Sequence, residues 1–152
     1  MEKVELKERK LAGLSLKTKT SNTNGQSTID CENLWHEFMA QKYMDIIPGR
    51  INEIIGAYHQ YEGDSSHPFS YFIGCEVKSD STIPDGLDTL IIPAGNFMKI
   101  AAKGKMPDCV TDAWKKVWVA DLPRTYQIDF EIYDERSKDW EDAQVDVYIS
   151  IR

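Results

Sequence analysis

RTYQIDFEIYDE, residues 124–135, alternates apolar and polar side chains, and this alternation predicts a β-strand. One face of the strand is apolar and consists of Ile128, Phe130 and Ile132. The other face is polar and consists of Asp129, Glu131 and Tyr133. A carboxylate therefore lies beside an aromatic ring, and the rest of the sequence must indicate whether this face is solvated or binds a ligand.

The two halves of the chain share one order of predicted elements. Ala12-Gly13 in RKLAGLSLKTKT resembles Ala94-Gly95 in IIPAGNFMKIAAKG. Each stretch precedes a helix-like segment that contains tryptophan, CENLWHEFMAQKY or CVTDAWKKVWVA. Two strand-like runs follow each helix, INEIIGAYHQYEG and FSYFIGCEV in the first half, TYQIDFEIYDE and QVDVYISI in the second. The predicted order is β-α-β-β, repeated once.

This order predicts an α+β fold in which an antiparallel sheet carries the helices on one face. The length of 152 residues fits a single domain, residues 1–152, with repeat one at about 2–78 and repeat two at about 87–152. Residues 78–86 form the joint, which is too short to separate independent domains.

Composition excludes several classes of function. Lys and Arg total 18 against 25 Asp and Glu, and a net charge of −7 argues against binding to nucleic acid or to an anionic membrane. No apolar run approaches the ~20 residues of a membrane helix, and the N-terminus has no signal-peptide pattern, so we expect a cytoplasmic protein. The three cysteines fit no disulfide or metal spacing and are expected to be reduced. The histidines show no zinc-like spacing, and no nucleotide-binding or serine-nucleophile motif occurs, so no cofactor or metal is predicted.

The polar face of the 124–135 strand extends to neighbouring strands if the helices cover the face of Phe130. Matching the halves at Tyr58 and Tyr133 then predicts a shared face that contains Tyr58, Phe72, Glu76, Glu131, Tyr133 and Tyr148. Carboxylates on exposed strands are common and discourage aggregation, so this face could simply be solvated. Alternatively, its rings stack on a flat or cationic molecule while a carboxylate neutralises the charge.

Several segments, in this order, resemble the GyrI-like effector-binding domains: YFIGCEV, IIPAGNFMKIAAKG, AWKKVW and RTYQIDFEIYDE with VDVYISI. That group, with its duplicated SHS2-type fold, includes the ligand-binding parts of bacterial multidrug-sensing transcription regulators and gyrase-inhibitory proteins. The chain is most similar to the single-domain, integron-cassette type, and the resemblance covers nearly all of it.

The resemblance implies a saddle-like sheet with a ligand cleft between the repeats and a glutamate that pairs with cationic, aromatic drugs. By position in DFEIYD this glutamate would be Glu131, and Glu76 is a second acidic candidate. Trp114, Trp118 and Tyr133 correspond to positions that can line the cleft.

The expected function is therefore small-molecule effector binding, as a stand-alone ligand sensor or a sequestering protein. The effector-like part begins at residue 2, so direct DNA binding is not expected, and transcription regulation would need a protein partner. Two alternatives stay open. One is hydrolysis of reactive small molecules by Glu131 with Tyr133 or Tyr148, and the other is inhibition of a protein partner such as gyrase.

Overall fold

The computed structural model describes residues 1–47, 53–64 and 66–152. The first half contains β1 (Glu2–Leu6), β2 (Arg9–Ser15), α1 (Gln26–Ala40), β3 (Ile54–His59) and β4 (Ser70–Val77). The second half contains β5 (Asp88–Ile92), β6 (Gly95–Gly104), α2 (Asp108–Val119), β7 (Arg124–Tyr133) and β8 (Ala143–Ile151). Short 3₁₀ turns are η1 (Thr23–Gly25), η2 (Tyr43–Asp45) and η3 (Glu135–Ser137). Ile51 and Asn52, the start of the predicted strand-like run INEIIGAYHQYEG, lie outside the described residues.

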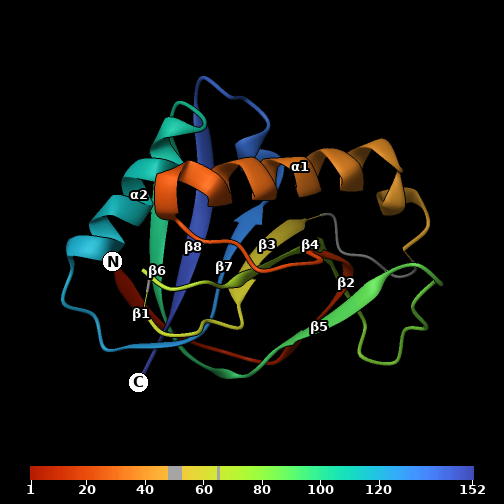
Figure 1. Ribbon diagram of the computed structural model, residues 1–152, viewed down its shortest axis with the longest axis horizontal. Helices are drawn as coiled ribbons and strands as arrows, with labels where there is room; N and C mark the ends of the chain where they lie inside the picture. Colours follow the sequence, from red (N-terminus) through yellow and green to blue (C-terminus); the bar gives the residue numbers. More distant parts are fainter. Residues whose placement is uncertain (48–52, 65) are drawn as a thin grey trace.

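All of these strands form one antiparallel sheet of eight, in the order β1-β6-β8-β7-β3-β4-β2-β5 (Figure 1). β3 and β7 pair at the centre, and their hairpin partners β4 and β8 flank them. The α+β class and the repeated β-α-β-β order are confirmed. The edge strands β1 and β5 were not predicted as separate strands. Each pairs with a strand of the other half, β1 with β6 and β5 with β2, so the halves are tied together at both edges.

Both helices lie on one face of the sheet, as predicted (Figure 1). α1 buries Leu34 and Phe38, four residues apart, against side chains of β2 and β4. α2 buries Ala113 and Val117, again four residues apart, against β6 and β8. The two helices therefore cover the two halves of the sheet and leave its centre, β3 and β7, between them. Within the described residues, no helix is long and apolar enough to cross a membrane.

The face without helices is also buried, which requires the sheet to curl around its own side chains. One apolar cluster on this face draws side chains from all eight strands. At its centre Phe130 is fully buried, stacks on Tyr148 at 4.7 Å between ring centroids and meets Phe97 edge-on at 5.4 Å. The protein thus has cores on both sides of one sheet. On the helix side they are built on β2 and β4 under α1 and on β6 and β8 under α2, and on the other side the core is centred on Phe130 of β7.

This second core overturns the prediction that the helices cover the face of Phe130. In the β7–β8 ladder Glu131 is paired with Val147, and paired residues of adjacent strands lie on the same face. Val147 packs under α2, so Glu131 lies on the helix side. The prediction was wrong because a sheet buried on both faces has apolar rows on both, and alternation alone does not say which row faces the helices.

Candidate functional site

A cleft of about 1110 Å³ opens between α1 and α2, above the uncovered centre of the sheet. Its walls come from the two helices, and its floor comes from β3, β4 and β7. At the centre of the cleft, aromatic rings surround Glu131, a glutamate of strand β7. The rings are those of Trp35, Tyr58, Tyr71, Trp114 and Tyr133. An aromatic cavity of this size is typical of a small-molecule site.

Glu131 lies in the floor of the cleft and is only 1% exposed. One carboxylate oxygen, Oε2, accepts hydrogen bonds from Trp114 Nε1 at 2.6 Å and from the Tyr58 hydroxyl at 3.2 Å. The other, Oε1, accepts from the Tyr133 hydroxyl at 2.8 Å. Three elements, α2, β3 and β7, therefore aim donors at one acid. The rings that carry these donors also face the cleft, so the acid lies behind an aromatic lining.

Burial raises the pKa of Glu131 above its ordinary value of 4.5, because a charged carboxylate loses the solvation of water. The hydrogen bonds from Trp114, Tyr133 and Tyr58 act in the opposite direction, since they stabilise the charged form. The pKa values of these two tyrosines are raised as well, first by burial and then by the charge of Glu131. The hydroxyls of Tyr58 and Tyr133 therefore stay protonated and keep donating hydrogen bonds to Glu131.

A second polar pair occupies the α1 side of the cleft, where Trp35 Nε1 donates to the Tyr71 hydroxyl at 2.8 Å. Gly56 makes room for this pair. It lies opposite Glu131 in the β3–β7 ladder, and a Cβ at this position would collide with the hydroxyl and ring of Tyr71. The glycine therefore lets a ring from β4 reach over β3 to the centre of the cleft.

Gly56→Ala is expected to lower the free energy of unfolding by about 1–3 kcal/mol, because Tyr71 is fully buried and has no room to move without strain. It should also change the fluorescence of Trp35, since its partner is displaced. Urea unfolding followed by tryptophan fluorescence measures both. Gly95→Ala is the matched control, because nothing lies within 4 Å of a Cβ there. Equal stability of the two variants would contradict this account of Gly56.

One known protein family matches nearly the whole chain. Residues 3–151 match the family described as Cass2, integron-associated effector binding protein. The chain belongs to this family. YobU of Bacillus subtilis (strain 168), named as a candidate transcriptional regulator, is 25% identical over 124 residues, 78% of each chain. The resemblance to effector-binding domains inferred from the sequence is confirmed.

Two solved structures show that this effector-binding protein shares its fold with known relatives. The integron cassette protein VCH_CASS2 of Vibrio cholerae superimposes with a TM-score of 0.76 at 24% identity, over 99% of this chain and 95% of that one. SAV2435, solved bound to tetraphenylphosphonium, gives a TM-score of 0.79 at 16% identity, over 99% and 93%.

The structure brings five of the predicted site residues of this effector-binding protein together in the cleft: Glu131, Tyr58, Tyr133, Trp114 and Trp118. Trp118 is at the mouth, where its side chain is 48% exposed. The geometry leaves these five as candidates for ligand contact. They come from three elements: Tyr58 from β3, Glu131 and Tyr133 from β7, and the two tryptophans from α2.

Three predicted residues lie elsewhere, which corrects the expected shared face. Phe72 and Tyr148 belong to the core on the helix-free side. Glu76, on the same row of β4 as Phe72, forms an ion pair with Arg9 at 3.2 Å. These three were misplaced for one reason: they share a face with Phe130, and Phe130 points away from the helices.

The aromatic cleft residues that the predicted site missed are Trp35, Tyr61, Phe69, Tyr71 and Trp140. Trp35 was expected chiefly to pack against the sheet, although the large ring of a tryptophan can also line a pocket. Tyr71 is in the β4 row opposite to that of Phe72, so placing Phe72 in the site excluded it. A correct choice of face would have found Tyr71 from strand alternation. Trp140, in the loop before β8 and 60% exposed, follows no periodic pattern that could indicate it.

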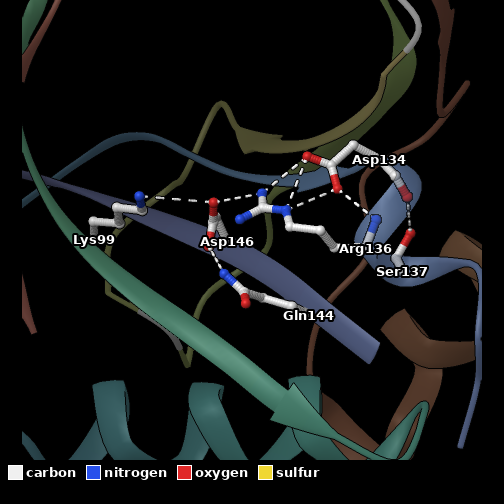
Figure 2. A network of polar contacts seen from close by, with 6 residues as sticks. All are labelled: Lys99, Asp134, Arg136, Ser137, Gln144 and Asp146. Carbon is white, nitrogen blue, oxygen red and sulfur yellow. Dashed lines mark hydrogen bonds and ion pairs between the residues drawn. The ribbon is translucent and has the colours of Figure 1, made fainter. Parts of the chain in front are cut away.

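The rim of the cleft beyond Tyr133 is fixed by a polar network (Figure 2). Arg136 donates to Asp134 Oδ2 at 2.9 Å and to Asp146 Oδ2 at 2.7 Å, and Lys99 lies 3.8 Å from the same Asp146 oxygen. The hydrogen bonds to Arg136 lower the pKa of Asp134 below its ordinary value. This network ties the turn that follows β7 to β8 and β6. Since Asp134 and the η3 turn line the cleft, it keeps one wall in place.

No group of three His, Cys, Asp or Glu side chains in the described part of the chain is arranged to hold a metal ion. The cleft is lined by ring faces, by tyrosine hydroxyls that donate to the Glu131 carboxylate, and by the further carboxylates of Glu32, Glu53, Asp134 and Glu135. These groups can contact an organic molecule.

Because the pKa of Glu131 is raised in the folded protein, the contribution of this residue to folding stability should depend on pH. Because the folded protein holds this proton more tightly than the unfolded chain, the stabilisation by protonated Glu131 is fully present below pH 4.5 and is lost as pH rises through the raised folded value. Glu131→Gln does not titrate. The stability of the variant relative to wild type should therefore rise with pH across this window, by up to about 1.4 kcal/mol per unit of pKa shift.

Urea unfolding of both proteins from pH 4 to pH 8 measures this difference, and effects of other titrating groups cancel. A relative stability that falls as pH rises would mean that the pKa of Glu131 is lowered, not raised.

Proposed function

We propose that this protein binds cationic aromatic or amphipathic small molecules in the cleft between α1 and α2, as a ligand sensor or a sequestering protein. Glu131 supplies the opposite charge, and Tyr58, Trp114 and Tyr133 supply the ring faces. Trp118 extends the aromatic wall to the mouth.

The observation that carries this proposal is that Glu131 has no counter-ion among the described residues. Three carboxylates are buried among the described residues. Asp129 is paired with Arg124 at 2.8 Å, and Asp146 with Arg136 at 2.7 Å. Glu131 has three neutral donors, and no Lys, Arg or His of the described residues lies within ion-pair distance. A buried acid that has no cation beside it in the described part of the chain, below an open aromatic cleft, favours a cation that arrives as ligand.

The carboxylate acts from behind the rings. A cation on the face of Trp114 or Tyr58 gains about 0.5–2 kcal/mol from each ring. At about 5–6 Å and an effective dielectric constant of about 20, a full negative charge on Glu131 adds about 3 kcal/mol. The hydrogen bonds from the ring edges to the carboxylate keep the rings oriented for this contact. The cation therefore stays beside the acid without displacing its donors.

A relative supports this class of ligand. SAV2435, which has the same fold, was solved bound to tetraphenylphosphonium, a cation surrounded by four phenyl groups. Such a molecule fits a cleft of about 1110 Å³ with aromatic walls.

The proposal is tested by a pair of ligands with the same shape and opposite charge, tetraphenylphosphonium and tetraphenylborate. We expect saturable quenching of tryptophan fluorescence by the cation, since Trp114 contacts the acid directly, and binding at least tenfold weaker for the anion. Titrations at one fixed ionic strength remove differences in screening. Equal affinity for both ions, or no saturation with either, would refute a cation site.

Hydrolysis is a second candidate, favoured by the same buried acid with a raised pKa and two tyrosine hydroxyls at 2.8 and 3.2 Å. It predicts turnover of an electrophilic small molecule that is lost in Glu131→Gln. A binding protein instead shows stoichiometric saturation, with no product formed over time.

A further inference from the structure

At one end of the cleft, a guanidinium is almost closed off from solvent and uses few of its donors. Arg124 lines the cleft and is 9% exposed. Its Nη2 donates to Asp129 Oδ2 at 2.8 Å, and among the described residues this is the one hydrogen bond that the guanidinium makes. Nε is buried and has no hydrogen-bond partner among the described residues. Because unpaired buried donors are unfavourable, the remaining N–H groups of Arg124 are suited to an acceptor that comes from outside the chain.

Asp129 does not need those remaining donors. Its Oδ2 also accepts from the Tyr61 hydroxyl at 2.7 Å, and its Oδ1 accepts from the backbone N–H of Ser150 at 2.9 Å and from the Ser150 hydroxyl at 3.3 Å. The aspartate is therefore fully hydrogen-bonded with a single guanidinium nitrogen, and Nη1 and Nε of Arg124 are left over.

The aromatic ring of Tyr126 covers one face of the Arg124 guanidinium. Tyr126 lies in the bulge between Arg124 and Asp129, where the β7–β8 register shifts, and has a φ of 54°. A non-glycine residue in this left-handed region is strained by about 1–3 kcal/mol. The strained backbone sets the Tyr126 ring over the guanidinium, 4.2 Å from its central carbon. One face of the cation is thus covered by the ring, and among the described residues its edge makes one hydrogen bond, from Nη2 to Asp129.

We propose that Arg124 is a second polar subsite of the cleft and binds the carboxylate of a zwitterionic aromatic ligand whose cationic end lies at Glu131. This inference rests on the proposed cation site. Asp129 and Glu131 are two residues apart on one face of β7, which separates them by about 7 Å. An aromatic scaffold of two or three fused rings spans such a distance between its two charged groups. The cleft then selects molecules with both charges over simple cations.

Two dyes test this selectivity. Rhodamine 110 and rhodamine 123 share a cationic ring system, and the first has a free carboxylate where the second has its methyl ester. We measure the ratio of their dissociation constants by fluorescence anisotropy in wild type and in the double variant Arg124→Met with Asp129→Asn. The double change removes the ion pair as a unit, so no buried charge is left unpaired. The ratio cancels any effect that is common to both dyes.

The preference for rhodamine 110 over rhodamine 123 should fall about tenfold in the double variant, since a charged hydrogen-bond partner is lost. An unchanged ratio would overturn the inference. Rhodamine 123 also tests the cation site separately through Glu131→Gln. If its binding depends on Glu131 while the ratio does not change, only the role of Arg124 fails. If neither dye binds, the proposed function fails and the inference with it.

A measurement on the wild-type protein applies even if the double variant does not fold. The Nε–H resonance of Arg124 should shift on saturation with rhodamine 110 and shift much less with rhodamine 123, because only the carboxylate reaches the guanidinium. Equal shifts with the two dyes would contradict a carboxylate subsite.

Discussion

Glu131→Gln should weaken the binding of tetraphenylphosphonium about 10- to 100-fold and leave the fold intact. The substitution keeps the size of the side chain and an oxygen that accepts from Trp114, whose Nε1 donates at 2.6 Å. It removes the negative charge, which contributes about 1.4–3 kcal/mol to a cation held on the surrounding rings. Isothermal titration calorimetry measures the affinity of both proteins, and circular dichroism checks the fold.

Glu76→Gln is the matched control for this experiment. Glu76 also lies in a strand, but on the opposite face, where it pairs with Arg9 at 3.2 Å. Its side chain is 23% exposed, so its loss should change cation affinity less than twofold. If Glu76→Gln weakens binding as much as Glu131→Gln does, the ligand lies on the other face of the sheet or the charge effect is non-specific.

Phe130→Ala should lower the free energy of unfolding by about 3–5 kcal/mol, the largest stability effect expected here. The ring is completely buried in the core on the helix-free face. It stacks on Tyr148 at 4.7 Å, meets Phe97 at 5.4 Å and lies under the Arg9 guanidinium at 5.5 Å. Truncation leaves a cavity between strands that the rigid sheet cannot close. Urea denaturation monitored by circular dichroism measures the loss.

Ile91→Ala provides the comparison. Ile91 is in the edge strand β5 and is 42% exposed, so its truncation should lower the unfolding free energy by less than about 1 kcal/mol. A small effect at Phe130 would contradict a second buried core on the helix-free face of the sheet.

The order of elements could be predicted from the sequence because the helix and strand periods differ. Leu34 and Phe38 recur at helical spacing, whereas Glu131 and Tyr133 alternate with apolar neighbours. The edge strands could not be predicted in the same way. β1 and β5 have five residues each, and each is held by a strand of the opposite half, a pairing that no local pattern encodes.

Which residues share the cleft depended on a choice of face that alternation did not determine. Phe130 and Val147 are both apolar and both buried, yet Phe130 lies in the core on the helix-free face and Val147 in the core under α2. Glu131 was predicted as a cleft residue because glutamate is uncommon inside a strand, and the family resemblance indicated the same position. The contact between Trp35 and Tyr71 was not found, since it depends on Gly56, whose contribution is the absence of a side chain.

The most direct test of the cation site is the ionisation of Glu131 itself, followed by the ¹³C resonance of its carboxyl carbon as pH is varied. The resonance is assigned by its disappearance in Glu131→Gln. In the free protein, we expect the pKa of Glu131 to lie above its ordinary value of 4.5. Saturation with tetraphenylphosphonium should lower it, because a neighbouring cation favours the charged carboxylate and the coupling is reciprocal. The same titration midpoint with and without the bound cation would show that Glu131 is not its counter-charge.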